Sequence, residues 1–291
     1  MDTREIIKKV RLIELRSRKN ANELLMGEYK SSFKGRGMIF SEIRPYQFGD
    51  DVRNIDWNTT ARYNEPYIKV FEEERELTMI LMVDASASHQ FGTRKQFKSE
   101  LITEICATLA LSAIRFNDRV GLLLYTEEVE LFIPPKKGRK HVLRIIRELI
   151  NFEPKHKSNN LATALRFAFD TFKRKTNIFV LSDFIDDSKY EKNLRVAAKK
   201  HDVAGIRIID EREVVLPDVG LIRLTDNESG KTKLINTSSP KLRYDYTEFH
   251  RRMSHRFEQT FKNAGAGQIE IRTGEDFVKP LLNYFKKHSA K

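Results

Sequence analysis

The chain has 291 residues, of which 40% are apolar, so it can bury a large core without disulfides or a structural metal. Its single cysteine, Cys106, excludes a disulfide framework and a thiolate metal cage, and its apolar-periodic surroundings predict that it is buried. No run approaches the roughly 20 apolar residues that cross a bilayer, and the first 18 residues carry mixed charge rather than a secretory signal. We therefore expect a cytoplasmic protein without a membrane span.

The charge balance favours basic residues, with 53 Lys and Arg against 41 Asp and Glu and a formal net charge of +12. Such an excess suits an anionic partner, but no aromatic residues interleave with the basic ones, as stacking on single-stranded nucleic acid would require. A solvated helix face is the favoured interpretation, and binding to nucleic acid or to an anionic surface remains an alternative. The basic residues concentrate at Lys136, Lys137, Arg139, Lys140, Arg144 and Arg147, and again at Lys155 and Lys157.

The first part of the chain does not follow the pattern of the rest. A helical pattern over residues 3–25 leads into a Gly-rich turn at 34–37 and then into extended segments that end at 72–74. We predict a small α/β arm or subdomain over residues 1–75, ahead of a main domain over residues 76–291.

A motif in this arm combines a glycine, which permits a turn, with acidic and basic residues. It runs from Gly49 to Arg53, where Arg53 can pair with Asp50, Asp51 or Asp56. Trp57 follows, and because an isolated tryptophan is usually buried, we expect it to anchor the arm in a core. A structural role is favoured over partner docking.

The main domain alternates short β-rich runs with helical stretches, which indicates an α/β fold with a doubly wound, mostly parallel sheet and helices on both faces. The strand at 77–84 is apolar without alternation, so both of its faces should be buried. We predict strands at 77–84, 120–125, 130–133, 177–182, 203–209 and 268–272. Helices are predicted at 95–116, 140–152, 161–172, 189–200, 242–262 and 277–287, with a hairpin inserted near 214–236.

Hard oxygen ligands follow two of these strands. Asp84, Ser86 and Ser88 form an Asp-x-Ser-x-Ser loop after the first strand, and Asp183 follows the strand at 177–182. In open α/β sheets, loops at the carboxyl ends of the strands form the binding crevice. Oxygen ligands without His or Cys suit Mg²⁺, or alternatively Mn²⁺ or Ca²⁺, better than zinc.

At these residues the sequence resembles a von Willebrand factor A domain, whose metal-ion-dependent adhesion site uses an Asp-x-Ser-x-Ser loop, a Thr from a second loop and an Asp from a third. The resemblance implies that Asp84, Ser86 and Ser88 form the first loop and that Asp183 belongs to the third. The Thr position falls on Asn159, with Ser158 beside it. Either side chain offers an oxygen, although neither is the family residue.

A wider resemblance covers nearly the whole chain. The segments at 37–46, 49–57 and 61–62, the run at 216–220 and the stretch at 277–285 are similar to the signature of a bacterial family catalogued only as a domain of unknown function. Its members place a von Willebrand factor A-like domain after the first of these segments. The resemblance implies that the protein works with a MoxR-type AAA+ ATPase in assembling or maturing client proteins.

The leading hypothesis is a non-enzymatic module in which the cation keeps an open position for an Asp or Glu of a protein partner. The first alternative is an Mg²⁺-dependent phosphohydrolase, but Ser86 occupies the position where such an enzyme carries its general acid. The second is binding of nucleic acid or an anionic surface, for which we see less support.

Overall fold

The computed structural model describes residues 12–17, 20–21, 38–73, 77–86, 92–93, 96–186, 188–225 and 231–289. The chain divides into a small unit, Phe33–Leu77, and a main unit made of Met1–Ser32 and Thr78–Lys291. The small unit thus ends close to the predicted boundary at residue 75 but begins later than residue 1. Helical residues 12–17 belong with the main unit, where Arg16 lies 3.1 Å from Glu104 and Glu14 lies 2.6 Å from Arg139.

A six-stranded sheet forms the centre of the main unit, in the order β12-β9-β8-β3-β6-β7. Its strands are parallel except for β7, which pairs antiparallel with β6 at one edge. The mixed α/β architecture with a mostly parallel sheet is therefore confirmed. The strands are β3 (Thr78–Asp84), β6 (Arg119–Tyr125), β7 (Val129–Lys136), β8 (Asn177–Ser182), β9 (Asp202–Ile209) and β12 (Gly267–Arg272).

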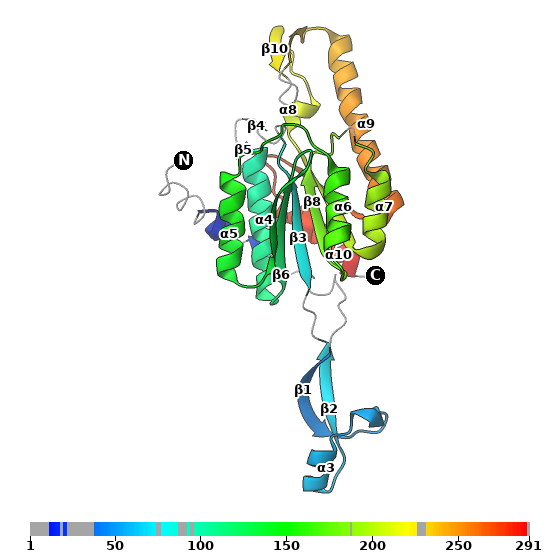
Figure 1. The fold of residues 1–291 in the computed structure, drawn as a ribbon. Coiled ribbons are helices and arrows are strands. Elements are labelled where there is room, and N and C mark those ends of the chain that lie inside the picture. Colours follow the sequence, from blue (N-terminus) through cyan, green and yellow to red (C-terminus); the bar gives the residue numbers. More distant parts are fainter. Residues whose placement is uncertain are drawn as a thin grey trace. The chain divides into compact units, whose positions relative to one another are not determined.

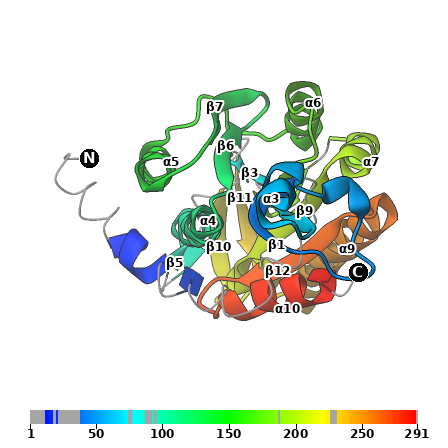
Figure 2. The same cartoon turned by 90° about the horizontal axis from the view of Figure 1, so that it is seen from below.

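Helices cover both faces of this sheet (Figures 1 and 2). One face carries α4 (Lys98–Arg115), α5 (Arg139–Asn151) and α10 (Val278–Ser289). The other carries α6 (Leu161–Thr171), α7 (Glu191–Lys200) and α9 (Pro240–Ala264). Within the described part of the chain, no helix is both long and apolar enough to cross a membrane.

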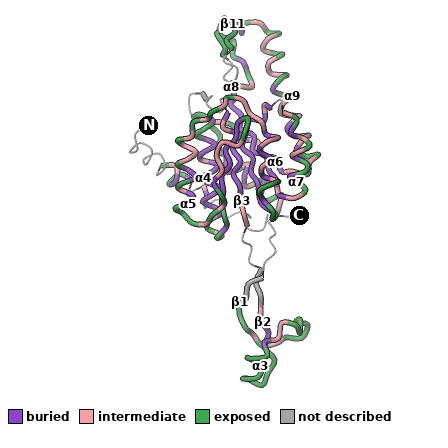
Figure 3. The backbone as a smooth tube through the Cα atoms, in the orientation of Figure 1, coloured by how far each residue is buried: buried purple, intermediate pink, exposed green. Residues whose placement is uncertain are grey.

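The core lies along the central strands, which are buried in Figure 3. Every residue of β3 after Thr78 is buried, as expected for a strand that is covered on both faces. Cys106 is fully buried in α4, as predicted. Gly205 of β9 lets α9 approach closely, because a Cβ atom at this position would lie 2.5 Å from the ring of Phe261.

The predicted hairpin is present as β10 (Leu221–Thr225) and β11 (Thr232–Asn236), which pair antiparallel. It follows the short helix α8 (Glu211–Val214) and lies, with the first half of α9, beyond the carboxyl edge of the sheet (Figure 1). The apolar stripe of α9 therefore packs only in part: Phe257 and Phe261 are buried, whereas Phe249 is exposed.

The small unit contains an antiparallel pair, β1 (Met38–Pro45) and β2 (Tyr67–Glu73), and between them a 3₁₀ turn at Val52–Asn54 and helix α3 (Trp57–Tyr63). Helix α3 stands where the sequence predicted only extended segments. Asp56 caps it by accepting a hydrogen bond from the amide of Asn58. The prediction that Trp57 is buried is wrong, since 70% of its surface is exposed. Two strands and one short helix offer too little apolar surface to enclose an indole ring.

The charged motif of the small unit forms two separate ion pairs. Arg53 pairs with Asp51 at 2.7 Å. Arg44 makes a two-pronged contact with Asp50, with both N–O distances at 2.8 Å, and it holds the pKa of that carboxyl below its usual range. The motif thus closes the turn that connects β1 to the 3₁₀ segment.

Candidate functional site

The order of the strands reverses between β3 and β8. From β3 the chain proceeds outward to β6 and β7, then returns to β8 on the other side of β3 and continues to β9 and β12. In open α/β sheets, this switch point opens a crevice at the carboxyl ends of the strands. Asp84 ends β3 and Asp183 follows β8, so both predicted carboxylates lie at the switch point.

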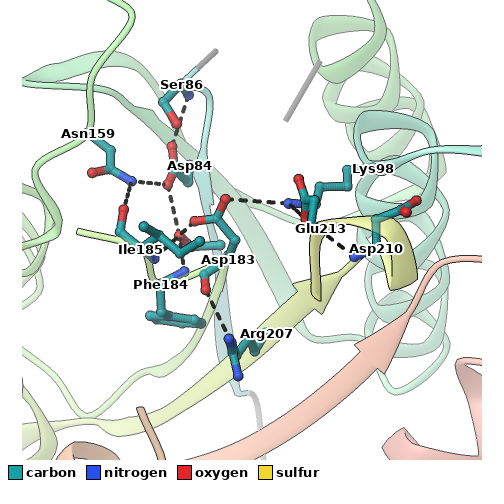
Figure 4. Close-up of polar contacts among 11 residues, drawn as sticks. Asp84, Ser86, Lys98, Asn159, Asp183, Phe184, Ile185, Arg207, Asp210 and Glu213 are labelled. Carbon is teal, nitrogen blue, oxygen red and sulfur yellow. Dashed lines mark hydrogen bonds and ion pairs between the residues drawn. The ribbon is translucent and has the colours of Figure 1, made fainter. Parts of the chain in front are cut away.

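The carboxylate of Asp84 accepts hydrogen bonds from Ser182, Asn159 and Ser86 (Figure 4). Its Oδ2 atom accepts from the hydroxyl of Ser182 and from the amide nitrogen of Asn159, each at 2.8 Å. Its Oδ1 atom accepts from the backbone amide of Ser86 at 2.9 Å. Asp84 and Ser86 are both buried. The donors around Asp84 in these contacts are neutral, and together they fix its orientation.

Asn159 connects the three loops that the sequence singled out. Its Nδ2 atom contacts Asp84 after β3 and also lies 3.4 Å from the carbonyl oxygen of Ile185, which follows β8. The nitrogen faces Asp84 because a carboxylate only accepts hydrogen bonds. To offer its oxygen to a cation, the amide group would have to turn.

The remaining predicted residues lie differently. Ser158 donates its hydroxyl hydrogen bond to Glu127 rather than toward Asp84. Ser88 lies outside the described residues. The structure therefore brings together Asp84, Ser86, Asn159 and Asp183.

Asp183 has a different environment from Asp84. Its Oδ1 atom accepts from the backbone amide of Ile185 at 3.1 Å, and its Oδ2 atom lies 3.4 Å from Nζ of Lys98. Lys98 begins α4, is fully buried, and also lies 2.5 Å from Oε2 of Glu213 in α8. A lysine is rarely buried, so the sequence offers no signal for this ion pair.

A second positive charge, that of Arg207, also lies beside Asp183. Arg207 of β9 donates from Nε to the backbone oxygen of Asp183 at 3.3 Å, and its side chain is only 3% exposed. Burial raises the pKa of Glu213, although the ammonium group of Lys98 opposes this effect. Sequence analysis also missed Arg207, but its position inside the apolar run at 203–209 is a usable signal, since a buried charge needs a partner.

Asp186, three residues after Asp183, is also buried. The chain turns at Phe184, whose φ of 55° is left-handed, and Asp186 then accepts a hydrogen bond from the amide of Leu161 at 2.9 Å. This contact satisfies a free amide at the start of α6.

Negative charge concentrates at the carboxyl end of β3. Burial raises the pKa of Tyr125 well above its usual value, and the negative charges of Asp84 and Asp186 raise it further. Among the residues that the structure describes, no three His, Cys, Asp or Glu side chains are grouped to hold a metal ion. Hydroxyl groups and water would therefore have to complete a cation site that uses Asp84 and Asp183. This mixed set of oxygens fits a hard divalent cation.

Comparison with solved structures supports the fold. The chain is similar to the conserved hypothetical protein BatB from Bacteroides thetaiotaomicron, with a TM-score of 0.51, 13% sequence identity, and coverage of 74% of this chain and 100% of that one. It is also similar to the SpRpn10 VWA domain, with a TM-score of 0.42, 11% identity, and coverage of 72% of this chain and 95% of that one. The support for the fold comes from BatB, and at 13% identity that likeness concerns the architecture alone.

Comparison with curated sequences covers almost the whole chain. The chain is 30% identical over 288 residues to the uncharacterized protein Mb1516 of Mycobacterium bovis, which covers 98% of this chain and 90% of that protein. The uncharacterized protein Rv1480 of Mycobacterium tuberculosis matches with the same identity and coverage. Residues 42–256 match the family described as protein of unknown function DUF58. The chain therefore belongs to the DUF58 family.

Proposed function

We propose that this protein is a binding module that captures an acidic side chain of a protein partner through a divalent cation. The observation that carries the proposal is the meeting of Asp84 and Asp183, from two strands, at the switch point of the sheet. Hydroxyl and amide oxygens lie in the same loops, and such hard donors suit Mg²⁺, Mn²⁺ or Ca²⁺.

Each residue has a distinct part in this proposal. Asp84 and Asp183 supply the negative charge, while Ser86, and Ser88 outside the described residues, supply neutral oxygens. Asn159 adds its oxygen once the amide group turns. The bound cation supplies a positive charge whose exchangeable waters a partner's carboxylate can replace.

The buried ammonium group of Lys98 limits how tightly this site holds a cation. It lies 3.4 Å from Asp183 and so neutralises part of the charge that a divalent cation would meet. We therefore expect an affinity that depends strongly on Asp84, which supplies the other carboxylate of the site. A partner carboxylate would complete the coordination and strengthen the complex.

The partner that the resemblance implies is a MoxR-type AAA+ ATPase, or a client protein that such an ATPase processes. The proposal is tested by immobilising the full chain and measuring capture of a purified MoxR-type ATPase with Mg²⁺ and with a chelator. We expect capture in Mg²⁺ and its loss in the chelator. Because an ATPase binds Mg²⁺ itself, the chelator alone does not locate the cation.

A variant of this chain locates it. Asp84→Ala should lose capture in Mg²⁺, because it removes a carboxylate from this chain and leaves the ATPase unchanged. Asp170→Ala is the matched control, since Asp170 is an exposed carboxylate on α6 that pairs with Arg166 at 3.9 Å. Capture that persists in Asp84→Ala would contradict the proposed site. Capture that survives the chelator as well would favour a metal-independent surface.

A further inference from the structure

A pocket of about 340 Å³ lies beside the candidate cation site, between α9, α8 and the ends of β9 and β12. Its size falls in the range of small-molecule sites. Three guanidinium groups line it, from Arg207, Arg251 and Arg272, and Glu270 is the carboxylate among the lining residues. Val214 and Val215 form an apolar wall.

The most deeply placed of these groups is Arg207. It stands on the face of the sheet covered by α9, between Ser182 of β8 and Glu270 of β12. Its side chain is 3% exposed, and its Nη1 atom is buried without a hydrogen-bond partner. The Oε2 atom of Glu270 lies 3.5 Å away, which is longer than an arginine–carboxylate hydrogen bond. The buried charge of Arg207 is thus only partly compensated.

The charges of Arg251 and Arg272 are also only partly neutralised by the residues that line the pocket. Arg272 lies 3.5 Å from Oε1 of Glu270, so the single carboxylate is shared between two guanidinium groups. Arg251 pairs at 2.9 Å with Glu248, which does not line the pocket. Among the lining residues, Glu270 is thus the carboxylate that faces three arginines.

We infer that this pocket binds a small organic monophosphate, with the phosphate against the three arginines and a short apolar body against Val214 and Val215. A phosphate monoester carries close to two negative charges and accepts several hydrogen bonds, so it suits the guanidinium groups of Arg207 and Arg272, which share one carboxylate. Burial lowers the pKa of Arg207, and a bound anion would offset this cost of desolvation. His250 adds a neutral polar group to the same wall.

Calorimetry on the full chain without added metal tests the inference, with phenyl phosphate, inorganic phosphate and phenol as probes. Phenyl phosphate should bind with a stoichiometry of one and at least about fivefold more tightly than inorganic phosphate, because only it uses the apolar wall. Phenol, which lacks the charge, should show no measurable binding. Absence of phenyl phosphate binding at millimolar concentration, or equal binding of phenol, would overturn the inference.

Surface variants separate this pocket from the general basic charge of the chain. Arg251→Ala and Arg272→Ala should each weaken phenyl phosphate about tenfold, the usual scale for a hydrogen bond to a charged group. Both residues are exposed, so their replacement should leave the fold intact. Arg252→Ala is the control, because Arg252 is the next residue on α9 and does not line this pocket. An equal loss in Arg252→Ala, or no loss in the other two variants, would show non-specific attraction and overturn the inference.

Discussion

Two regions at the carboxyl edge of one sheet carry opposite charges. The acidic cluster, formed by Asp84, Asp183 and Asp186, lies where β3 and β8 end. The arginine pocket, formed by Arg207, Arg251, Arg272 and Glu270, lies where β9 and β12 end. Asp84 accepts hydrogen bonds from Ser182, Asn159 and Ser86, whereas Arg207 is a buried cation whose Nη1 atom has no hydrogen-bond partner. The same edge of the fold thus suits a cation on one side and an anion on the other.

Asp183 is the member of the acidic cluster that contacts the arginine pocket. Its side chain meets Lys98 and its backbone oxygen meets Arg207, so the boundary between them consists of buried ionic contacts. A buried charge that loses its partner is costly, and this makes the boundary sensitive to single substitutions.

Replacing Lys98 should disrupt the boundary most. Lys98→Met keeps the length of the side chain but leaves Asp183 and Glu213 without their buried counter-charge. The free energy of unfolding should fall by about 3 to 5 kcal/mol, measured by chemical denaturation at pH 7. In the double variant Lys98→Met/Glu213→Gln, the loss should be smaller than the sum of the two single losses, because the two residues share one interaction. Additive losses would mean that the ion pair does not couple them.

The pH dependence of stability reports on the arginine pocket. Burial and the charges of Arg207 and Lys98 lower the pKa of His250 to about 4, while Asp183 acts weakly in the opposite direction. In the unfolded chain His250 binds a proton near pH 6.5, whereas in the folded chain it binds one only near pH 4. Stability is therefore lost as the pH falls through this window. His250 should account for roughly 2 kcal/mol of the loss between pH 7 and pH 5.

Two variants isolate the contribution of His250 to this loss of stability. The free energy of unfolding is measured by chemical denaturation at pH 7, 6 and 5. His250→Asn should flatten the dependence in part, since His201, which is also buried with a pKa lowered to about 4, remains. His255→Asn should leave it unchanged, because His255 is exposed on the same helix. A steeper dependence in His250→Asn would contradict a neutral His250.

The fold was largely predictable because its apolar patterns are local. The strand predicted at 177–182 agrees with β8, and the helices predicted at 161–172 and 242–262 agree with α6 and α9 to within two residues at each end. The small unit was less predictable, since α3 depends on a cap at Asp56 and Trp57 has no core to enter. Chain patterns cannot show whether a short segment finds enough partners to bury an aromatic ring.

For the candidate site, the sequence predicted the candidate ligands but not the buried ion pair beside them. Strand ends followed by Asp84 and Asp183 indicated where oxygen atoms gather, and Asn159 lies in the loop from which a third ligand was expected. Lys98 and Glu213 were not predictable, because their pairing joins α4 to α8 across more than a hundred residues of sequence. Such contacts depend on how helices pack on the sheet, which local pattern does not determine.

Replacing Asn159 tests how its side chain affects cation binding at the acidic cluster. Asn159→Thr removes the amide nitrogen that now occupies Oδ2 of Asp84 and places a neutral hydroxyl closer to the backbone. Mg²⁺ should bind about tenfold more tightly, since changes around metal ligands alter affinity by about 10 to 100-fold. Calorimetric titration decides the outcome. Weaker binding in the variant would mean that the amide oxygen of Asn159 already serves as a ligand.

The smallest effect is expected from the basic residues at the end of β7 and the start of α5. Replacing Lys136, Lys137, Arg139 and Lys140 by Ser should change Mg²⁺ affinity by less than about twofold, because charges that are at least partly exposed act weakly over distance in salt. Binding to duplex or single-stranded DNA, measured at several salt concentrations, provides the second readout. Partner capture that disappears together with DNA binding would favour the electrostatic alternative.

Calorimetric titration of Mg²⁺ and Mn²⁺ into the full chain and into Asp84→Ala tests whether a divalent cation binds at the carboxyl ends of β3 and β8. We predict one cation per chain for the unmodified protein and no measurable binding for Asp84→Ala, with circular dichroism showing that the variant retains its fold. Cation binding that is unchanged in Asp84→Ala, or that is absent from the unmodified protein, would contradict this prediction.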